Sequence, residues 1–285
     1  MPAESVDAFE AQRGRCFAIA YRMLGSAAEA EDIVQEAWLR WRRVEGTIEV
    51  PAAWLTTTVT RLCLDYLDSA RVRREHYVGP WLPEPIETPV DEVDPESISI
   101  AFLLLLERLT PAERAAYLLR KVFDVEYAEI AAMLGKSEPA VRQLFHRAGE
   151  HVDAARPRFA ASKDQHLRLL TSFMLAVESG EVATLEALLA EDARSWNDGG
   201  GRTRTALNVV EGRTRVAKLF TGLIKKGGSA GLRPELRELN GWPALVFWRG
   251  DDLAMALTIE TDGALVHAVH SVVNPDKLHA LVGRG

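Results

Sequence analysis

The side chains best suited to recognition chemistry lie between residues 136 and 147, where polar groups recur at the spacing of one helical face. Side chains of these types can reach base edges and phosphates of nucleic acid. The residues of this face are Lys136, Ser137, Glu138, Arg142, Gln143, His146 and Arg147. The pattern predicts DNA contact, and the simpler alternative is a helical hairpin with a solvated face.

Two helices joined by a tight turn are needed to position that face. Residues 126–147 place Ala131, Gly135 and Val141 where steeply crossing helices need a small contact, a turn and an apolar anchor. Ser137 is a good N-cap for the second helix. The spacing therefore predicts a helix-turn-helix.

Bond-making chemistry has weaker support in the sequence. Asp198, His267 and His270 are the only tempting candidates for a general acid–base pair, which would need two groups converging in an apolar cavity. His267 and His270 are three residues apart, so in a regular strand they face opposite sides. No Cys/His/Asp cluster has metal-ligand spacing, and Gly199–Gly201 lacks the context of a phosphate loop. We expect no catalytic residue, no metal and no cofactor.

The net charge of −7 over 285 residues is unusual for a protein that binds DNA alone. Residues 1–160 carry the whole excess, with 19 Lys/Arg against 26 Asp/Glu. Part of it is an acidic run of Glu84, Glu87, Asp91, Glu92, Asp94 and Glu96. Basic residues cluster elsewhere, which indicates DNA binding with help from a larger partner.

Targeting signals are absent from the sequence pattern. No apolar run approaches the roughly 20 residues that span a membrane, and the N-terminus has no signal pattern. Cys16 and Cys63 fall on apolar stripes, as expected for buried side chains in a reducing cytosol. We expect a cytoplasmic protein without a membrane partner.

The first half of the chain is predicted to be helical, with one interruption. Apolar spacing predicts helices within residues 8–42 and over 52–70, the second with Thr56, Thr57 and Thr60 outward. Five prolines between residues 79 and 96 favour an extended, solvated linker, and helices resume from 97 to about 156.

The second half is predicted to form an α+β domain. Helices are expected over residues 165–179, 181–190 and 213–225. Strand-like runs follow, with tight antiparallel turns between them, at Leu232–Leu239, Ala244–Trp248, Leu253–Ile259 and Leu265–Val273. The fold class expected for the chain is therefore multi-domain, with two all-α domains followed by an α+β domain.

Three motifs in the first half resemble extracytoplasmic-function sigma factors of the σ70 type. Glu29–Trp41 and Pro51–Leu67 are similar to the second conserved region, and Leu109–Arg114 with the helix-turn-helix to the fourth. The resemblance implies core RNA polymerase as partner, through its β′ clamp and β flap, together with promoter DNA. It implies that the helix-turn-helix reads the −35 element.

The same resemblance assigns roles to two further sets of residues. Those implied to dock on polymerase are Asp32, Gln35, Glu36, Leu39 and Arg40. Those implied to lie near the single-stranded −10 element are Trp54, Thr57, Thr60, Arg61, Arg71 and Arg73. Family members usually carry an amide near Arg61, so this position departs from the pattern.

In related factors the linker threads the polymerase cleft, whose surfaces are basic. The acidic run would suit such a groove, and neutralising Glu87, Asp91, Glu92 and Asp94 should then change initiation or promoter escape. A merely solvated linker is the alternative.

Three further motifs together resemble one subgroup of these factors, commonly numbered ECF41, whose C-terminal extension has a SnoaL-like, NTF2-type fold. Their residues are Trp81, Leu82, Pro83, Glu84 and Pro85; Asp198, Gly199, Gly200, Gly201 and Arg202; and Asn274, Pro275, Asp276, Lys277 and Leu278. In that subgroup the appended domain regulates the sigma factor in cis, and the motifs suit contact surfaces between domains. A simple hairpin turn remains the alternative for Asp198–Arg202.

The resemblance implies four parts, namely residues 1–78 (region 2), 79–96 (linker), 97–160 (region 4) and 161–285 (SnoaL-like domain). An unknown small-molecule ligand could occupy the last of these, lined by Trp196, Phe220, Phe247, Trp248 and Met255, although most of these residues suit a plain core. The alternative function is a ligand-responsive helix-turn-helix regulator without sigma activity, which would bind a palindromic site as a dimer.

Overall fold

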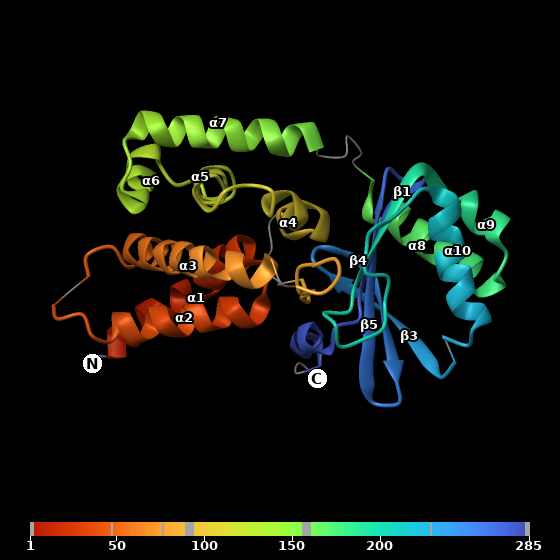
Figure 1. Cartoon of the computed structure of the whole chain (residues 1–285). Coiled ribbons are helices and arrows are strands. Elements are labelled where there is room, and N and C mark those ends of the chain that lie inside the picture. The colour runs from red at the N-terminus through yellow and green to blue at the C-terminus, as the bar shows by residue number, and fades with distance from the viewer. Residues whose placement is uncertain are drawn as a thin grey trace. The chain divides into compact units, whose positions relative to one another are not determined.

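The computed structural model describes residues 3–46, 48–75, 77–88, 94–155, 161–228 and 230–282 (Figure 1). Side chains are described for these residues except at positions 3, 4, 70–75 and 155. The chain divides into two compact units. The first comprises Met1–His76 and Phe102–Arg156, and the second Tyr77–Ala101 and Pro157–Gly285.

Three long helices form the first part of unit 1: α1 (Ala3–Leu24), α2 (Ala27–Trp41) and α3 (Pro51–Glu75). Gly25 ends α1 with a left-handed φ of 69°. The Ser26 side chain then accepts from the Glu29 backbone N–H, so it caps α2 as the sequence predicts.

The second part of unit 1 contains α5 (Pro111–Lys121), α6 (Tyr127–Leu134) and α7 (Glu138–Ala155), while the short α4 (Ile100–Leu106) begins at the unit boundary. Thr110 and Glu113 form a reciprocal capping box at the start of α5. Helix α6 ends at Gly135, which adopts the left-handed conformation with φ 62°. The predicted helix-turn-helix is therefore confirmed.

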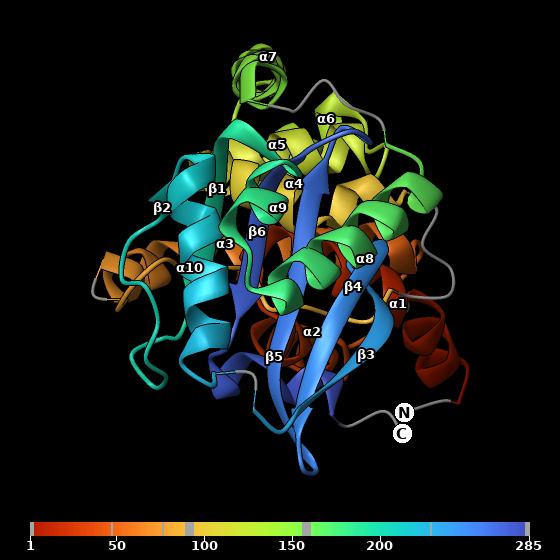
Figure 2. The same cartoon turned by 90° about the vertical axis from the view of Figure 1, so that its right-hand side faces the viewer.

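Unit 2 is a six-stranded sheet with helices on one face. Its helices are α8 (Lys163–Ser179), α9 (Val182–Glu186) and α10 (Arg213–Lys225), with short 3₁₀ turns at Pro95–Ile98, Pro275–Lys277 and His279–Leu281. Its strands are β1 (Leu189–Asp198), β2 (Val210–Glu211), β3 (Leu232–Leu239), β4 (Trp242–Arg249), β5 (Asp252–Thr261) and β6 (Val266–Val272). Figure 2 shows the three helices in front of the sheet, whose strand order is β2-β1-β6-β5-β4-β3.

The predicted antiparallel pairing of β3 to β6 is confirmed, but the start of the sheet was missed in the sequence. The expected helix 181–190 ends early, and β1 begins at Leu189 and pairs parallel with β6. Glu191, Asp192 and Arg194 mask the strand character of β1, because they face solvent while Ala193 enters the core. The α+β class holds, with one parallel pair.

The core of unit 2 lies between the helices and the sheet. It is built on buried apolar residues of α8, α10 and the central strands, among them Phe173, Phe220 and Phe247. The two aromatic rings of Phe173 and Phe220 meet edge to face, with centroids 5.3 Å apart.

Candidate functional site

The outer face of the helix-turn-helix carries the predicted DNA-contacting side chains. Ala131 and Val141 are buried beneath it, as the motif requires. Lys136, Ser137, Arg142, Gln143, His146 and Arg147 are exposed, and Glu138 is half-buried. The structure therefore presents the predicted set on one accessible surface.

Two arginines on this face are held by acidic partners. The Arg142 Nη2 lies 2.5 Å from Glu138 Oε1, and its guanidinium carbon lies 4.2 Å from the centre of the Tyr127 ring. The Arg147 Nε lies 3.4 Å from Glu113 Oε1. These contacts orient the two guanidinium groups and satisfy part of their charge before any DNA arrives.

The outer face of α2 carries the residues predicted to dock on polymerase. Asp32, Gln35, Leu39 and Arg40 are exposed, and Glu36 is half-buried. Arg40 Nε lies 2.9 Å from Glu36 Oε1, and the Leu39 side chain offers an apolar contact at 37% exposure. The face is thus mixed in charge and free of core residues.

The predicted −10 face of α3 is less open than the sequence indicates. Arg61 is exposed and Thr57 is half-buried, whereas Thr56 and Thr60 are 4% and 0% exposed. The prediction that Thr56 and Thr60 face outward is wrong, because α3 packs against α5 and α6 as well as against α1 and α2. Trp54 is half-buried, with its ring edge-on to Trp41 at 5.5 Å.

Two predicted arginines of this set cannot be placed. The side chains of Arg71 and Arg73 lie outside the described residues, although α3 runs through both positions. Asp91 and Glu92 of the predicted acidic run also lie outside them.

The segment that follows α3 is extended, as predicted, but it is not solvated. Leu82 and Ile86 are 0% and 6% exposed, and Pro83, Glu84 and Pro85 are also buried. The sequence favoured a solvated linker because prolines and carboxylates prefer water, but it could not show that unit 2 offers partners for them.

The buried carboxylate of Asp198 holds this segment to unit 2. Its Oδ1 accepts from the Tyr77 hydroxyl at 2.5 Å, and its Oδ2 accepts from the Leu82 backbone N–H at 2.8 Å. The Lys277 ammonium lies 2.8 Å from the same Oδ2 and donates to the Leu82 carbonyl at 2.5 Å. We call this group of Tyr77, Leu82, Asp198 and Lys277 the linker latch.

The latch draws residues from all three motifs that were singled out in the sequence. Asp198 is 0% exposed and the Lys277 side chain 8%, so their ion pair is shielded from water. The Lys277 ammonium also lies 4.3 Å from the centre of the Trp81 ring. Asn274 donates to the Tyr77 hydroxyl at 3.0 Å.

Tyr77 was missed by the sequence analysis. It precedes the Trp81 motif by four residues and has no pattern of its own. Burial, followed by the hydrogen bond to Asp198, raises the pKa of Tyr77 well above its ordinary value, so the hydroxyl remains a donor.

The glycine run beside Asp198 serves close packing. Gly200 has φ 55°, and a side chain there would overlap the Asn274 amide. Gly201 has φ 73° and lies against Val78. The sequence analysis offered a simple hairpin turn as the alternative to a contact surface for Asp198–Arg202. The structure has both, since this turn follows β1 and its glycines pack against Val78 and Asn274. Arg202 and Asp276 pair outside it at 3.2 Å, and both are exposed.

A second attachment lies four residues farther along the linker, at Ile86. Asn240, in a left-handed turn with φ 51°, accepts from the Ile86 N–H and donates to the Ile98 carbonyl. Its own backbone N–H donates to the Ile86 carbonyl at 2.9 Å. The Gly241 N–H donates to the Thr88 hydroxyl at 2.8 Å.

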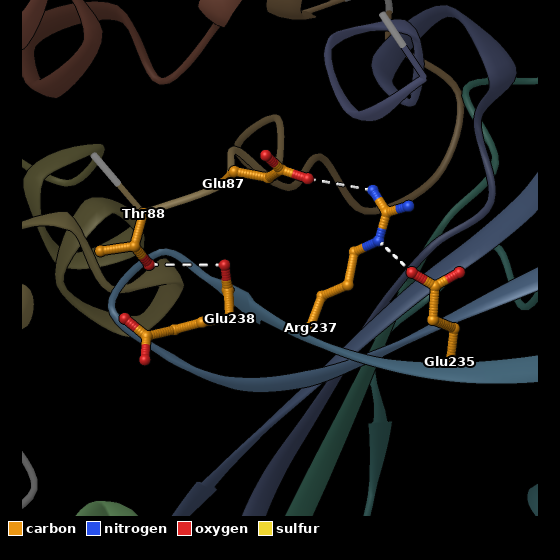
Figure 3. Close-up of a pocket in the computed structure, with 5 residues that line it drawn as sticks. All are labelled: Glu87, Thr88, Glu235, Arg237 and Glu238. Atoms are coloured by element: carbon orange, nitrogen blue, oxygen red, sulfur yellow. Dashed lines mark hydrogen bonds and ion pairs between the residues drawn. The ribbon is translucent and has the colours of Figure 1, made fainter. Parts of the chain in front are cut away.

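Beside this attachment is an open polar pocket of about 400 Å³ (Figure 3). Glu87 of the linker and Glu235 of β3 share the Arg237 guanidinium, at 3.0 and 2.8 Å. The hydrogen bond from Arg237 lowers the pKa of Glu235. The Arg237 guanidinium is already paired with both of these carboxylates. The pocket therefore marks a contact between the linker and β3.

The acid–base candidates do not converge. His267 Nε2 lies 2.9 Å from Asp262 Oδ2, and His270 is buried with its Nε2 3.2 Å from Glu260 Oε1. Asp198 belongs to the latch.

Among the described residues, no group of three or more His, Cys, Asp or Glu could hold a metal ion. In the same residues, no helix is long and apolar enough to cross a membrane.

The residues proposed to line a cone pocket are mostly core. Phe220 and Phe247 belong to the buried cluster, and Met255 packs against it. Trp248 donates to Glu235, and Trp196 packs on His270 at 5.2 Å.

Cys16 and Cys63 are buried as predicted; burial raises the pKa of Cys16 to about 11 and that of Cys63 further.

Comparison with known proteins gives the same organisation. Residues 8–73 match the model of Sigma-70 region 2, and residues 99–152 match Sigma-70, region 4. The ECF RNA polymerase sigma factor SigJ of Mycobacterium tuberculosis is 42% identical over 78% of this chain and 74% of its own length. The probable ECF RNA polymerase sigma factor SigI of that species is 30% identical over 98% and 97%.

A solved structure resembles nearly the whole chain. The crystal structure of the Mycobacterium tuberculosis extracytoplasmic function sigma factor SigJ covers 96% of this chain and 98% of its own, with a TM-score of 0.77 and 35% identity. The alternative of a regulator without sigma function is not favoured. The chain belongs to the extracytoplasmic-function family of RNA polymerase sigma factors.

Proposed function

We propose that unit 2 regulates this sigma factor in cis by holding its linker in the latch. As a sigma factor, the chain directs core RNA polymerase to promoters. The observation that carries the proposal is the wholly buried Asp198 carboxylate, which is bonded to Leu82 of the linker and to Tyr77 just before it, and is paired with Lys277. A linker that is held there is not available to the polymerase cleft.

The chemistry of the latch favours a two-state release. Removing one partner of a buried ion pair costs about 3–5 kcal/mol, because the other charge remains buried without compensation. Asp198 and Lys277 both belong to the part of unit 2 that follows residue 157, so the pair stays together when the linker leaves and becomes hydrated. The linker is therefore held by neutral donors and acceptors around a permanent charge pair, which suits reversible release.

The residue roles inferred from the family remain part of the proposal. The exposed face of α7 contacts the −35 element, Arg61 and its neighbours on α3 lie near the −10 strand, and the outer face of α2 docks on polymerase. The four-part division of the chain and a cytoplasmic location are proposed with them. We assign no catalytic role to unit 2, because its three candidate acid–base residues, Asp198, His267 and His270, pair with different partners.

The acidic-linker hypothesis takes a narrower form. Glu84 is buried and Glu87 pairs with Arg237, so these carboxylates are committed to unit 2 while the linker is docked. Only a released linker can offer them to a basic polymerase groove. A small-molecule ligand in unit 2 remains a proposal without a defined site.

The test is Asp198→Asn in the full chain, with transcription from a cognate promoter at limiting core polymerase. The substitution leaves Lys277 buried without a counter-charge, so the linker should be released and initiation should rise several-fold. Asp251→Asn, an exposed position in the turn between β4 and β5, is the matched control and should change nothing. Equal or lower initiation with Asp198→Asn would refute a restraining latch.

A further inference from the structure

The guanidinium group of Arg142 is held in one orientation on the outer face of the helix-turn-helix. Its central carbon lies 4.2 Å from the centre of the Tyr127 ring, and its Nη2 donates to Glu138 Oε1 at 2.5 Å. The Arg142 side chain is nevertheless 53% exposed. A long side chain that is accessible and already oriented loses less conformational entropy when it binds a partner.

The Tyr127 ring is itself anchored in the helix-turn-helix. It meets Phe145 of α7 edge to face at 5.8 Å, and Phe145 stacks on Tyr117 of α5 at the same distance. Tyr117 is 5% exposed, so the three rings lead from the core towards the surface. The guanidinium carbon of Arg120 also lies 5.2 Å from the Tyr127 ring centre, with its charge paired to Asp124. The ring is therefore a fixed support for guanidinium groups.

The carboxylate beside Arg142 decides which kind of DNA group can bind there. Glu138 offsets the positive charge of Arg142 and would repel a phosphate that approached the same side chain. An uncharged base edge meets no such repulsion. The bond to Glu138 uses one of the five N–H donors of the guanidinium. No other hydrogen bond of the Arg142 side chain is found among the residues that the structure describes, so donors remain for a base.

Guanine is the base whose major-groove edge fits these donors. It presents two acceptors, N7 and O6, whereas adenine pairs an acceptor with an N–H donor that would oppose a guanidinium. Cytosine presents a donor, and thymine one acceptor beside a methyl group. In a helix-turn-helix the N-terminal residues of the second helix reach base edges, and Arg142 lies one turn after the start of α7.

We propose that Arg142 reads a guanine in the −35 element, and that Tyr127 and Glu138 are positioning residues that orient its guanidinium for this contact. The inference rests on the proposed contact of α7 with that element, and it adds the base that is read and the residues that fix the reading. Lys136 differs from Arg142, because it is exposed and has no acidic side-chain partner among the described residues. It suits a phosphate, a contact that carries no sequence information.

The test is a selection in which the full chain with core polymerase starts transcription from a cognate promoter whose −35 element is randomised. The wild-type chain should enrich guanine about tenfold at one position. Arg142→Gln should prefer adenine at that position, because a glutamine amide pairs with N6 and N7 of adenine, and should leave the other positions unchanged. A variant that merely unfolds cannot gain a new preference.

Two further variants test the positioning residues. Tyr127→Leu removes the ring but keeps an apolar side chain, so it should lower the guanine preference about threefold at that position alone. Tyr127→Phe keeps the ring and is the matched control, which should retain the preference. Glu138→Ala frees the guanidinium for phosphates, so it should lower the guanine preference and steepen the salt dependence of promoter binding. Equal preferences in Tyr127→Leu and Tyr127→Phe would overturn the positioning role of the ring.

Lys136→Ala separates a failure of this inference from a failure of the proposed −35 contact. It should weaken promoter binding about equally for all sequences and reduce the salt slope by about 1. If Lys136→Ala weakens binding but Arg142→Gln still selects guanine, or the wild-type chain selects none, then α7 contacts DNA and the reading by Arg142 is overturned. If neither variant changes binding or preference, α7 does not contact the −35 element and both proposals fail.

Discussion

At the scale of residues, the structure rests on a few buried polar groups whose partners come from distant parts of the chain. Asp198 is the clearest case, since its carboxylate is bonded to Tyr77, Leu82 and Lys277. Asn240 does the same for Ile86 and Ile98. Because buried polar groups are costly without partners, these residues fix where the linker lies.

His166 on α8 gives a prediction for the pH dependence of stability. Its ring stacks on Trp242 at 5.2 Å, and burial, opposed by a hydrogen bond to Pro243, lowers its pKa to about 4. The unfolded chain binds a proton near pH 6.5 and the folded chain does not, so stability falls as pH drops from about 6.5 towards 4. The free energy of unfolding should decrease by about 2 kcal/mol between pH 7 and pH 5 through this group.

Denaturant unfolding at the two pH values measures this loss. The variant His166→Gln has no titrating ring and should show a correspondingly smaller decrease. The same pH dependence in both proteins would mean that other groups account for it.

At the scale of elements, the sequence predicts those with a strong periodic pattern. The boundaries of α10 and β3 agree with the expected helix 213–225 and strand Leu232–Leu239. The capping signals at Ser26 and the left-handed Gly135 were also predictable, because local chemistry decides them. Strand β1 was not, since its parallel pairing with β6 is a long-range contact.

The candidate site also has features that local sequence patterns predict and features that only long-range contacts decide. The exposed face of α7 follows from helical spacing alone. The burial of Thr60 and the docking of the linker depend on tertiary contacts, which a single sequence does not reveal. Tyr77 carried no motif, so only the structure could place it beside Asp198.

The glycine turn that follows β1 gives the prediction at this scale. Gly200→Ala places a methyl group against the Asn274 amide in a backbone with φ 55°. It should lower the free energy of unfolding by about 1–3 kcal/mol more than its control, through overpacking. The control is Gly250→Ala, at a left-handed φ of 61° with open space around it, which carries only the backbone cost of about 1–2 kcal/mol. Denaturant unfolding measures both variants, and equal losses of unfolding free energy would show that the turn does not contribute to the latch.

At the scale of the whole molecule, the chain combines a DNA-binding unit with a second unit that holds the linker. The linker lies between the region 2 and region 4 helices in sequence, yet its described contacts with Asp198, Asn240 and Arg237 are with unit 2. A domain appended after region 4 can therefore act on the segment that joins regions 2 and 4, without a separate regulatory protein.

The most direct test of this account is amide hydrogen exchange of residues 81–88 in the full chain, free and bound to core polymerase. The Leu82 and Ile86 N–H groups are buried and donate to Asp198 and Asn240, so they should exchange slowly in the free chain. Polymerase binding should release the linker from unit 2 and expose the opposing surface around Lys277 to faster exchange. Unchanged slow exchange at Leu82, Ile86 and Lys277 in an initiation-competent complex would contradict the latch.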